Sequence, residues 1–154
     1  EVVVKPRISA GSDQTLRVRR GEAFTDGPIG PALVQPFLPA VAEEGEWSLF
    51  FFGGADGFSH ALTKVAAPGD FRVQPQFGGR VEARAAPNAA LKSAQAVLHA
   101  CPRPWTYARV DLIADGDGGY LLMELELIEP HLFLDQAPDG GAAFAAAMAA
   151  AVRA

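Results

Sequence analysis

The chain has 154 residues, enough for one domain with a sizeable core, and its 49% apolar and 20% charged residues are ordinary for a globular protein. A net charge of −5 without any run of Lys or Arg argues against a nucleic-acid-binding surface. One cysteine rules out an internal disulfide, and no stretch resembles a membrane span or a signal peptide, so we expect a cytoplasmic protein without a membrane partner.

The first third of the chain alternates between short apolar runs and turns rich in Gly, Ser and Pro. Strands are predicted at residues 2–5, which end at Pro6, at residues 16–19 and at residues 32–37, with a polar turn over residues 8–15. Because the chain begins inside a predicted strand and has no initiator Met, we expect it to be part of a longer protein.

The rest of the chain predicts a hairpin, a long loop and two helices. Residues 47–52 and 58–65 are β-favouring runs on either side of a Gly-rich turn. The loop over residues 66–86 is long enough to be functional rather than a simple connection. Residues 87–100 have helical spacing after a proline, and residues 142–153 form an Ala-rich last helix. Antiparallel strands with two helices indicate an α+β fold.

Two interpretations of the long loop remain open. Lys64 and Arg72 lie at or near it, and Phe71 and Phe77 are apolar anchors within it. A flexible loop with basic groups near acidic residues is typical of a lid over phosphates, and an ordinary surface loop is the alternative.

A hairpin near the end of the chain brings three carboxylates close together. Two alternating strands are predicted on either side of the Asp- and Gly-rich turn at residues 115–119. With the turn centred between its third and fourth residues, Asp111 pairs with Glu124. In the same register, Arg109 pairs with Glu126. The two glutamates are then about 6.6 Å apart along one face of the second strand.

The second strand is expected to be buried, with a core face and a polar face. Alternation assigns Leu121, Met123, Leu125 and Leu127 to the core face, and Tyr120, Leu122, Glu124, Glu126 and Ile128 to the other. Unpaired like charges are costly there, and a divalent cation that prefers oxygen would stabilise them, which predicts a Mg²⁺ platform. The alternatives are a solvated face with an Arg109–Glu126 ion pair, and, more weakly, a Ca²⁺ site at residues 115–117 that lacks EF-hand spacing.

An ordered set of motifs carries a resemblance to a known family. The motifs are VVKP at residues 3–6, SAGS at 9–12, QPFL at 35–38, GEWS at 45–48, DFR at 70–72, and ELE with EP at 124–130. The set resembles the ATP-grasp family, in particular bacterial glutathione synthetases and, more closely, the cyclo-ligases that act on O-ureido-serine. The resemblance implies an ATP-grasp-like antiparallel sheet packed with helices, with residues 1–154 as the C-terminal nucleotide- and metal-binding region and the N-terminal substrate domain absent.

The resemblance also implies which residues hold ATP. These are Lys5, Ser9, Gly11 and Ser12 at the phosphates, Gln35, Pro36, Phe37 and Leu38 at the adenine, and Glu43 or Glu44 at the ribose. Glu46 is a less favoured ribose ligand, because Trp47 and Ser48 replace a charged pair of the family. A single glycine stands where the family phosphate loop usually has two or three.

The implied chemistry is ATP- and Mg²⁺-dependent carboxylate–amine ligation, or cyclo-ligation, through an acylphosphate. Arg72 and Arg109 are the implied catalytic cations, and the implied metal ligands are Asp111, Glu124 and Glu126, the last of which replaces an Asn of the synthetase. Small carboxylates and amines are the implied partners, and such ligases often form homo-oligomers. A non-catalytic or incomplete nucleotide-binding fragment is the alternative. His131 follows the last motif and is the histidine to test.

Overall fold

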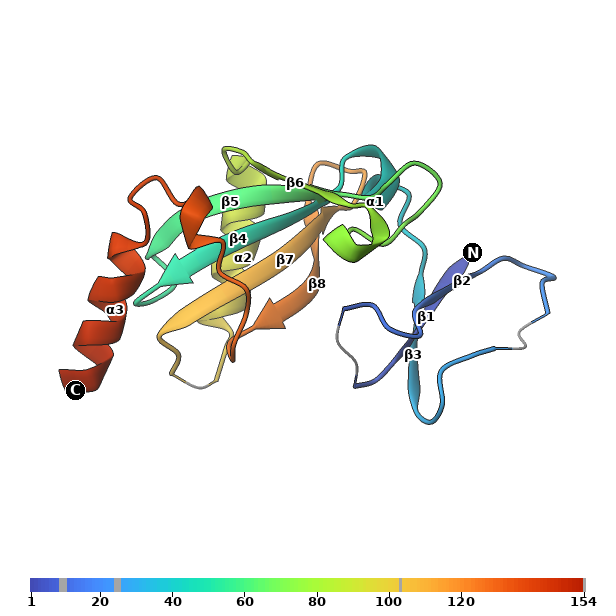
Figure 1. Cartoon of the computed structure of the whole chain (residues 1–154), viewed down its shortest axis with the longest axis horizontal. Coiled ribbons are helices and arrows are strands. Elements are labelled where there is room, and N and C mark those ends of the chain that lie inside the picture. Colours follow the sequence, from blue (N-terminus) through green and yellow to red (C-terminus); the bar gives the residue numbers. More distant parts are fainter. Residues whose placement is uncertain (9–10, 24–25, 103, 154) are drawn as a thin grey trace.

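The computed structural model describes residues 1–8, 11–23, 26–102 and 104–153, which form two antiparallel sheets with helices (Figure 1). The smaller sheet has the strand order β2-β1-β3, with β1 at Val2–Pro6, β2 at Leu16–Val18 and β3 at Ala32–Pro36. The α+β fold expected from the sequence is confirmed, and the three N-terminal strands lie within a residue of their predicted bounds.

The larger sheet carries most of the buried side chains among the described residues. Its order is β6-β5-β4-β7-β8, with β4 at Glu46–Phe52, β5 at Phe58–Val65, β6 at Arg80–Ala83, β7 at Tyr107–Ala114 and β8 at Tyr120–Glu126. The helices are α1 at Ala40–Glu43, α2 at Asn88–His99 and α3 at Ala142–Arg153, with 3-10 turns at Pro75–Phe77 and Leu134–Gln136. In Figure 1, α2 lies behind this sheet, and α3 lies at the end remote from the small sheet.

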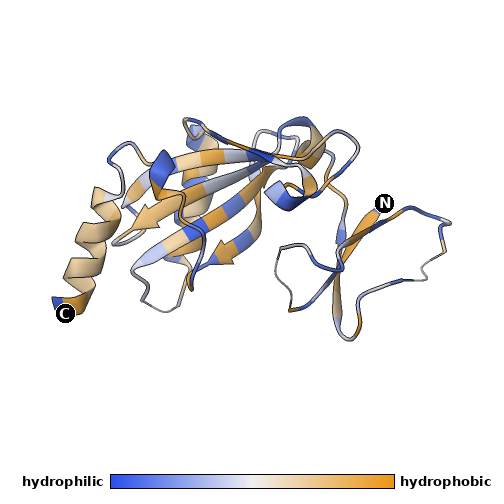
Figure 2. Ribbon diagram, viewed as in Figure 1, coloured by the Kyte–Doolittle hydropathy of each residue, from blue (hydrophilic) through white to orange (hydrophobic). Residues whose placement is uncertain are grey.

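Alternation along β4 gives the large sheet two packed faces. Trp47, Leu49 and Phe51 point toward α2, where Ala90 and Ala94 are fully buried and let the helix approach closely. Phe50, Phe52 and Leu62 form the opposite core, which is covered by Phe133 and by Phe144 of α3. Each fully buried side chain of this size contributes about 1.5–3 kcal/mol. Hydrophobic and hydrophilic residues also alternate along β7 and β8 (Figure 2).

The β7–β8 hairpin confirms the predicted pairing of the carboxylates but contains a bulge. Asp111 pairs with Glu124, and the register then shifts so that Leu112 pairs with Leu122 and Met123 is the extra residue. The predicted faces are therefore wrong beyond the bulge. Met123 lines the acidic face, and Tyr120 packs against the core under α2.

β8 is not the buried strand that the sequence predicted. It pairs only with β7 among the described residues and forms one edge of the sheet, so Leu121 and Leu122 are exposed. Leu125 and Leu127 do pack against the core, as predicted. The alternation predicted one buried face, but an edge strand has a neighbouring strand on one side only, which leaves its side chains more accessible.

The long loop is more structured than expected. It contains the 3-10 turn and the edge strand β6, which is short and polar and therefore gave no strand signal. Phe71 packs edge-on against Phe37, and the Gln76 amide donates a 3.3 Å hydrogen bond to the Gly11 carbonyl. The loop is thus joined to the small sheet at two points. No helix in the described part of the chain is long and apolar enough to cross a membrane.

Candidate functional site

A cleft of about 810 Å³ lies between the two sheets. The small sheet contributes Lys5 and Gln35, and the large sheet contributes the acidic face of β7 and β8. The loop over residues 66–79 provides Phe71 and Arg72. The cleft therefore has cationic groups on several sides and carboxylates at its base, which suits a ligand that carries phosphate groups and a divalent cation.

Asp111 is at the centre of the acidic face, and it is only 1% exposed. The Ser48 hydroxyl donates a 2.6 Å hydrogen bond to Oδ1. The Arg109 guanidinium donates to both carboxylate oxygens at 2.9–3.1 Å, and Lys64 Nζ donates to Oδ2 at 3.1 Å. These hydrogen bonds satisfy both oxygens of the buried carboxylate and hold the Asp111 side chain in a fixed orientation.

Lys64 joins Asp111 to Glu46, which is the cross-strand partner of Lys64 on β4. Nζ lies 3.2 Å from Glu46 Oε1, and both side chains line the cleft. The pKa of Glu46 is raised to about 7, chiefly by burial and also by the nearby Asp111 charge, while Lys64 opposes both effects. Glu46 is thus an acidic group in the cleft that one ammonium connects to the carboxylate at its base.

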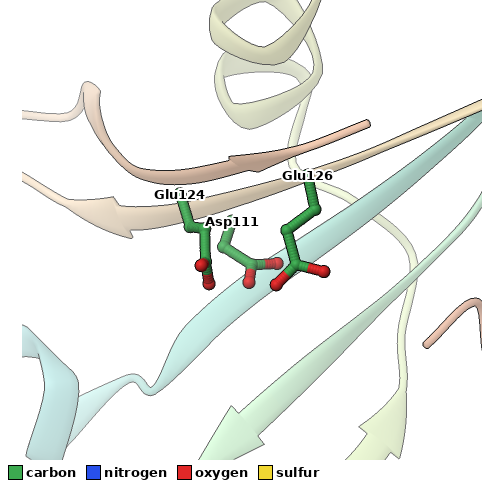
Figure 3. Close-up of side chains that lie close together, drawn as sticks. All are labelled: Asp111, Glu124 and Glu126. Carbon is green, nitrogen blue, oxygen red and sulfur yellow. The ribbon is translucent and has the colours of Figure 1, made fainter. Parts of the chain in front are cut away.

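Glu124 and Glu126 extend from β8 toward Asp111 on β7 (Figure 3). Each of the three carboxylates offers one oxygen within 4.8 Å of the other two. Arg109 Nη2 lies 2.5 Å from Glu126 and 3.6 Å from Glu124, so one guanidinium contacts all three acids. Burial raises the pKa of Glu126, and the Glu124 charge raises it as well. The Arg109 charge lowers this pKa and so offsets part of the rise. The Arg109–Glu126 ion pair of the solvated-face alternative forms, and on the same face Asp111 is buried whereas Glu124 is exposed.

This donor set fits a magnesium ion. Mg²⁺ binds oxygen at about 2.1 Å, so opposite ligands on one ion are about 4.2 Å apart, and a small side-chain rotation brings these oxygens into range. The turn at residues 115–119 does not offer a comparable set, because Asp115 Oδ1 already accepts hydrogen bonds from the backbone of Asp117 and Gly119.

The structure places most of the predicted site residues around the cleft. Those that line it are Lys5, Gly11, Ser12, Gln35, Phe37, Leu38, Arg72, Arg109, Asp111, Glu124 and Glu126, together with His131. Pro36, Glu43 and Glu44 are exposed and do not belong to the described lining residues, whereas Glu46 does. The predicted phosphate ligand Ser9 lies outside the described residues.

Sequence reasoning gave too little weight to Lys64, Ser48 and Glu46. In the sequence, Lys64 is recognisable only as a basic group near the long loop, and Ser48 only as a departure from a family motif. Counting outward from Ala55, the middle of the Gly-rich turn between β4 and β5, pairs Glu46 with Lys64. The structure has this pairing, and the register shift lies on the turn side of Phe50.

Comparisons with known proteins agree with this geometry. No family model matches the chain. The chain is 34% identical to the cycloserine biosynthesis protein DcsG of Streptomyces lavendulae over 167 aligned positions, which cover 97% of this chain and 54% of DcsG. The crystal structure of D-cycloserine synthetase DcsG superposes with a TM-score of 0.71 at 27% identity, covering 96% of this chain and 54% of that one.

A second solved structure extends the likeness of fold. The ATP-grasp ligase PsnB, in complex with a precursor variant, Mg and ADP, gives a TM-score of 0.61 at 22% identity, over 96% of this chain and 46% of PsnB. The chain spans about half the length of the proteins that it matches. In sequence and in fold the chain is thus similar to about half of DcsG, and it shares the fold of the ATP-grasp ligase PsnB.

Proposed function

We propose that this chain is the nucleotide- and metal-binding part of an ATP- and Mg²⁺-dependent ligase that joins a carboxylate to an amine, or closes a ring, through an acylphosphate. The observation that carries the proposal is the cluster of Asp111, Glu124 and Glu126 at the base of a cleft with Lys5 and Arg72 on its walls. The similarity to DcsG and to the fold of PsnB supports the same class of reaction.

The small sheet and the loops beside it are proposed to hold ATP. Lys5, Ser9, Gly11 and Ser12 would contact the phosphates, and the segment Gln35–Leu38 would lie against the adenine. A lysine at the end of a strand and backbone N–H groups in a small-residue turn are suitable partners for phosphate oxygens. Glu46 is our preferred ribose ligand because it lies in the cleft, and Glu43 and Glu44 do not line it.

Asp111, Glu124 and Glu126 would hold Mg²⁺, which neutralises charge on the phosphates when it is bound. Arg109 and Arg72 would stabilise the charge on the phosphoryl group as it passes to the substrate carboxylate. The amine would then displace phosphate from the acylphosphate. Side chains form no covalent bond in this scheme, so catalysis depends on positioning and charge neutralisation.

The proposal includes a cytoplasmic location, small-molecule carboxylate and amine substrates, and a homo-oligomeric full-length protein. The competing candidate is an incomplete nucleotide-binding fragment without activity of its own. The observation that favours it is the length of the chain, which is about half that of its relatives.

Calorimetric titration of this chain with a non-hydrolysable ATP analogue, with and without Mg²⁺, tests the proposal. We expect binding that requires Mg²⁺, because the triphosphate would bridge Lys5 to the carboxylates through the ion. Binding of equal strength without Mg²⁺ would contradict the metal assignment. A folded chain that binds the analogue in neither condition would favour the incomplete-fragment candidate.

Replacing Glu46 is expected to show which of the three glutamates binds the ribose of ATP. Glu46→Gln should weaken binding of the Mg²⁺–ATP analogue about tenfold, since a charge-assisted hydrogen bond to a ribose hydroxyl is lost. Glu43→Gln and Glu44→Gln serve as matched controls and should leave the affinity unchanged, because both side chains are exposed outside the cleft lining. The dissociation constants measured by calorimetry decide between them, and a loss confined to Glu43→Gln or Glu44→Gln would refute the assignment of Glu46.

A further inference from the structure

Asp70 makes an unusually complete set of contacts with the arginine that follows it by two residues. Its Oδ1 accepts hydrogen bonds from the backbone N–H groups of Phe71 and Arg72 at 2.7 and 2.9 Å. The Arg72 side chain donates from Nε to Oδ1 at 3.1 Å and from Nη2 to Oδ2 at 2.8 Å. The side-chain bonds lower the pKa of Asp70, and the backbone bonds add to this effect. One carboxylate thus fixes both the turn and the guanidinium.

Within the described part of the chain, the Arg72 side chain donates hydrogen bonds to Asp70 alone, which leaves one edge of the guanidinium free. A guanidinium has five N–H donors, and Asp70 takes one from Nε and one from Nη2. Three N–H groups remain, two on Nη1 and one on Nη2. One N–H of Nη1 and the remaining N–H of Nη2 form the terminal edge of the guanidinium, which adjoins the edge that Asp70 binds. Arg72 lines the cleft, while Asp70 is not among the described lining residues, so the carboxylate supports the arginine from behind.

The rest of the loop holds this pair in place. The Arg72 guanidinium lies over the Phe77 ring, 3.7 Å from its centroid, which confines the plane of the side chain. Phe71 packs against Phe37, and Gln76 donates to Gly11, so the loop is fixed to the small sheet on both sides of the arginine. An ion pair between partly exposed side chains adds little to stability, so the consequence of these contacts is orientation.

We propose that Asp70 is a positioning residue, which holds Arg72 so that its free edge receives two oxygens of the phosphoryl group in transfer. The inference rests on the proposed function and deepens it. An arginine with four rotatable bonds would lose conformational freedom each time it met the phosphoryl group, and Asp70 and Phe77 restrict that freedom beforehand.

Asp70→Asn is the informative variant, since it retains an oxygen for the two backbone N–H groups and removes the acceptor of Arg72 Nη2. We expect it to weaken binding of the Mg²⁺–ADP–fluoroaluminate complex, which mimics the phosphoryl group in transfer, about tenfold, and to leave Mg²⁺–ADP binding unchanged. Arg72→Ala should lose at least as much. Asp115→Asn is the matched control, because Asp115 also accepts two backbone N–H bonds in a turn but contacts no guanidinium that the structure records.

Hydrogen exchange at Arg72 Nε, measured by NMR on the nucleotide-free chain, gives a readout that does not depend on the proposed function. We expect slow exchange in the parent chain and exchange at least about fivefold faster in Asp70→Asn, as a hydrogen bond to the guanidinium weakens. Equal exchange rates, or unchanged affinity of Asp70→Asn for the fluoroaluminate complex, would overturn the proposal. If the exchange rates differ but the parent chain binds no nucleotide, Asp70 does orient Arg72, but its role toward a phosphoryl group fails together with the proposed function.

Discussion

Asp111→Ala is expected to abolish Mg²⁺-dependent nucleotide binding and to lower the free energy of unfolding by about 3 kcal/mol. The carboxylate is buried, and it separates Arg109 from Lys64, both of which donate to it. Without it, two buried cations face each other, and Glu126 and Glu46 remain as their partners. Binding is expected to be lost because Asp111 is the carboxylate that β7 contributes to the cluster.

Urea unfolding gives the stability change, and calorimetry with the Mg²⁺–ATP analogue gives the binding change. Asp111→Asn is a second variant, which keeps the shape of the side chain and should fold while still losing Mg²⁺-dependent binding. Asp115→Ala, in the turn of the same hairpin, is the control for a lost carboxylate without a buried cation partner in the structure. Unchanged stability in Asp111→Ala would show that the buried charges are not coupled as described.

Glu124→Ala is expected to remove Mg²⁺-dependent nucleotide binding without a measurable change in stability. The Glu124 side chain is 57% exposed, and its contact with Arg109 is 3.6 Å, longer than those of the other two acids. Exposed ion pairs contribute little to folding, so the loss should appear in metal affinity alone. Mg²⁺ binds through few protein carboxylates, and each one removed is a large part of the charge that holds it.

The measurement is a pair of titrations, Mg²⁺ alone and Mg²⁺ with the ATP analogue, beside a thermal unfolding curve. Glu82→Ala provides the control, since Glu82 is also an exposed glutamate on an edge strand of the same sheet. Ordinary affinity for the Mg²⁺ complex in Glu124→Ala would sink the metal assignment. A stability loss larger than that of Glu82→Ala would mean that Glu124 has a structural role as well.

The pairing of the carboxylates could be predicted because both strands alternate and the turn between them is rich in Gly and Asp. The bulge at Met123 could not, since an extra residue leaves the composition of the strand unchanged. The predicted pairing of Asp111 with Glu124 is confirmed although the turn is centred on Asp117, and not between Asp117 and Gly118 as predicted, because the extra residue Met123 offsets the difference. The prediction of faces failed at Tyr120 and Met123, on the turn side of the bulge.

The residues around Asp111 show why part of the site was invisible in the sequence. Lys64 lies 47 positions before Asp111 and Ser48 lies 63 positions before it, and both reach it only when β4 lies between β5 and β7. A motif reports residues that are close along the chain, whereas this cluster depends on strand order. The choice of ribose ligand could not be made from the sequence for the same reason. Glu43 lies in the helical turn α1 and is not among the described lining residues, whereas Glu46 lies on β4 and lines the cleft.

Because β8 is an edge strand, metal binding at its carboxylates would affect how often the strand opens. Glu124 and Glu126, two of the three clustered carboxylates, sit on β8. Among the described residues, the amide groups of this strand have a partner strand on one side only. Outer strands open more often than central ones, and each opening would separate both glutamates from Asp111 at once. A cation bound to these carboxylates would therefore stabilise the hairpin, because its free energy of binding would add to the free energy needed to open β8. The protection of β8 amides from hydrogen exchange would then rise with metal concentration.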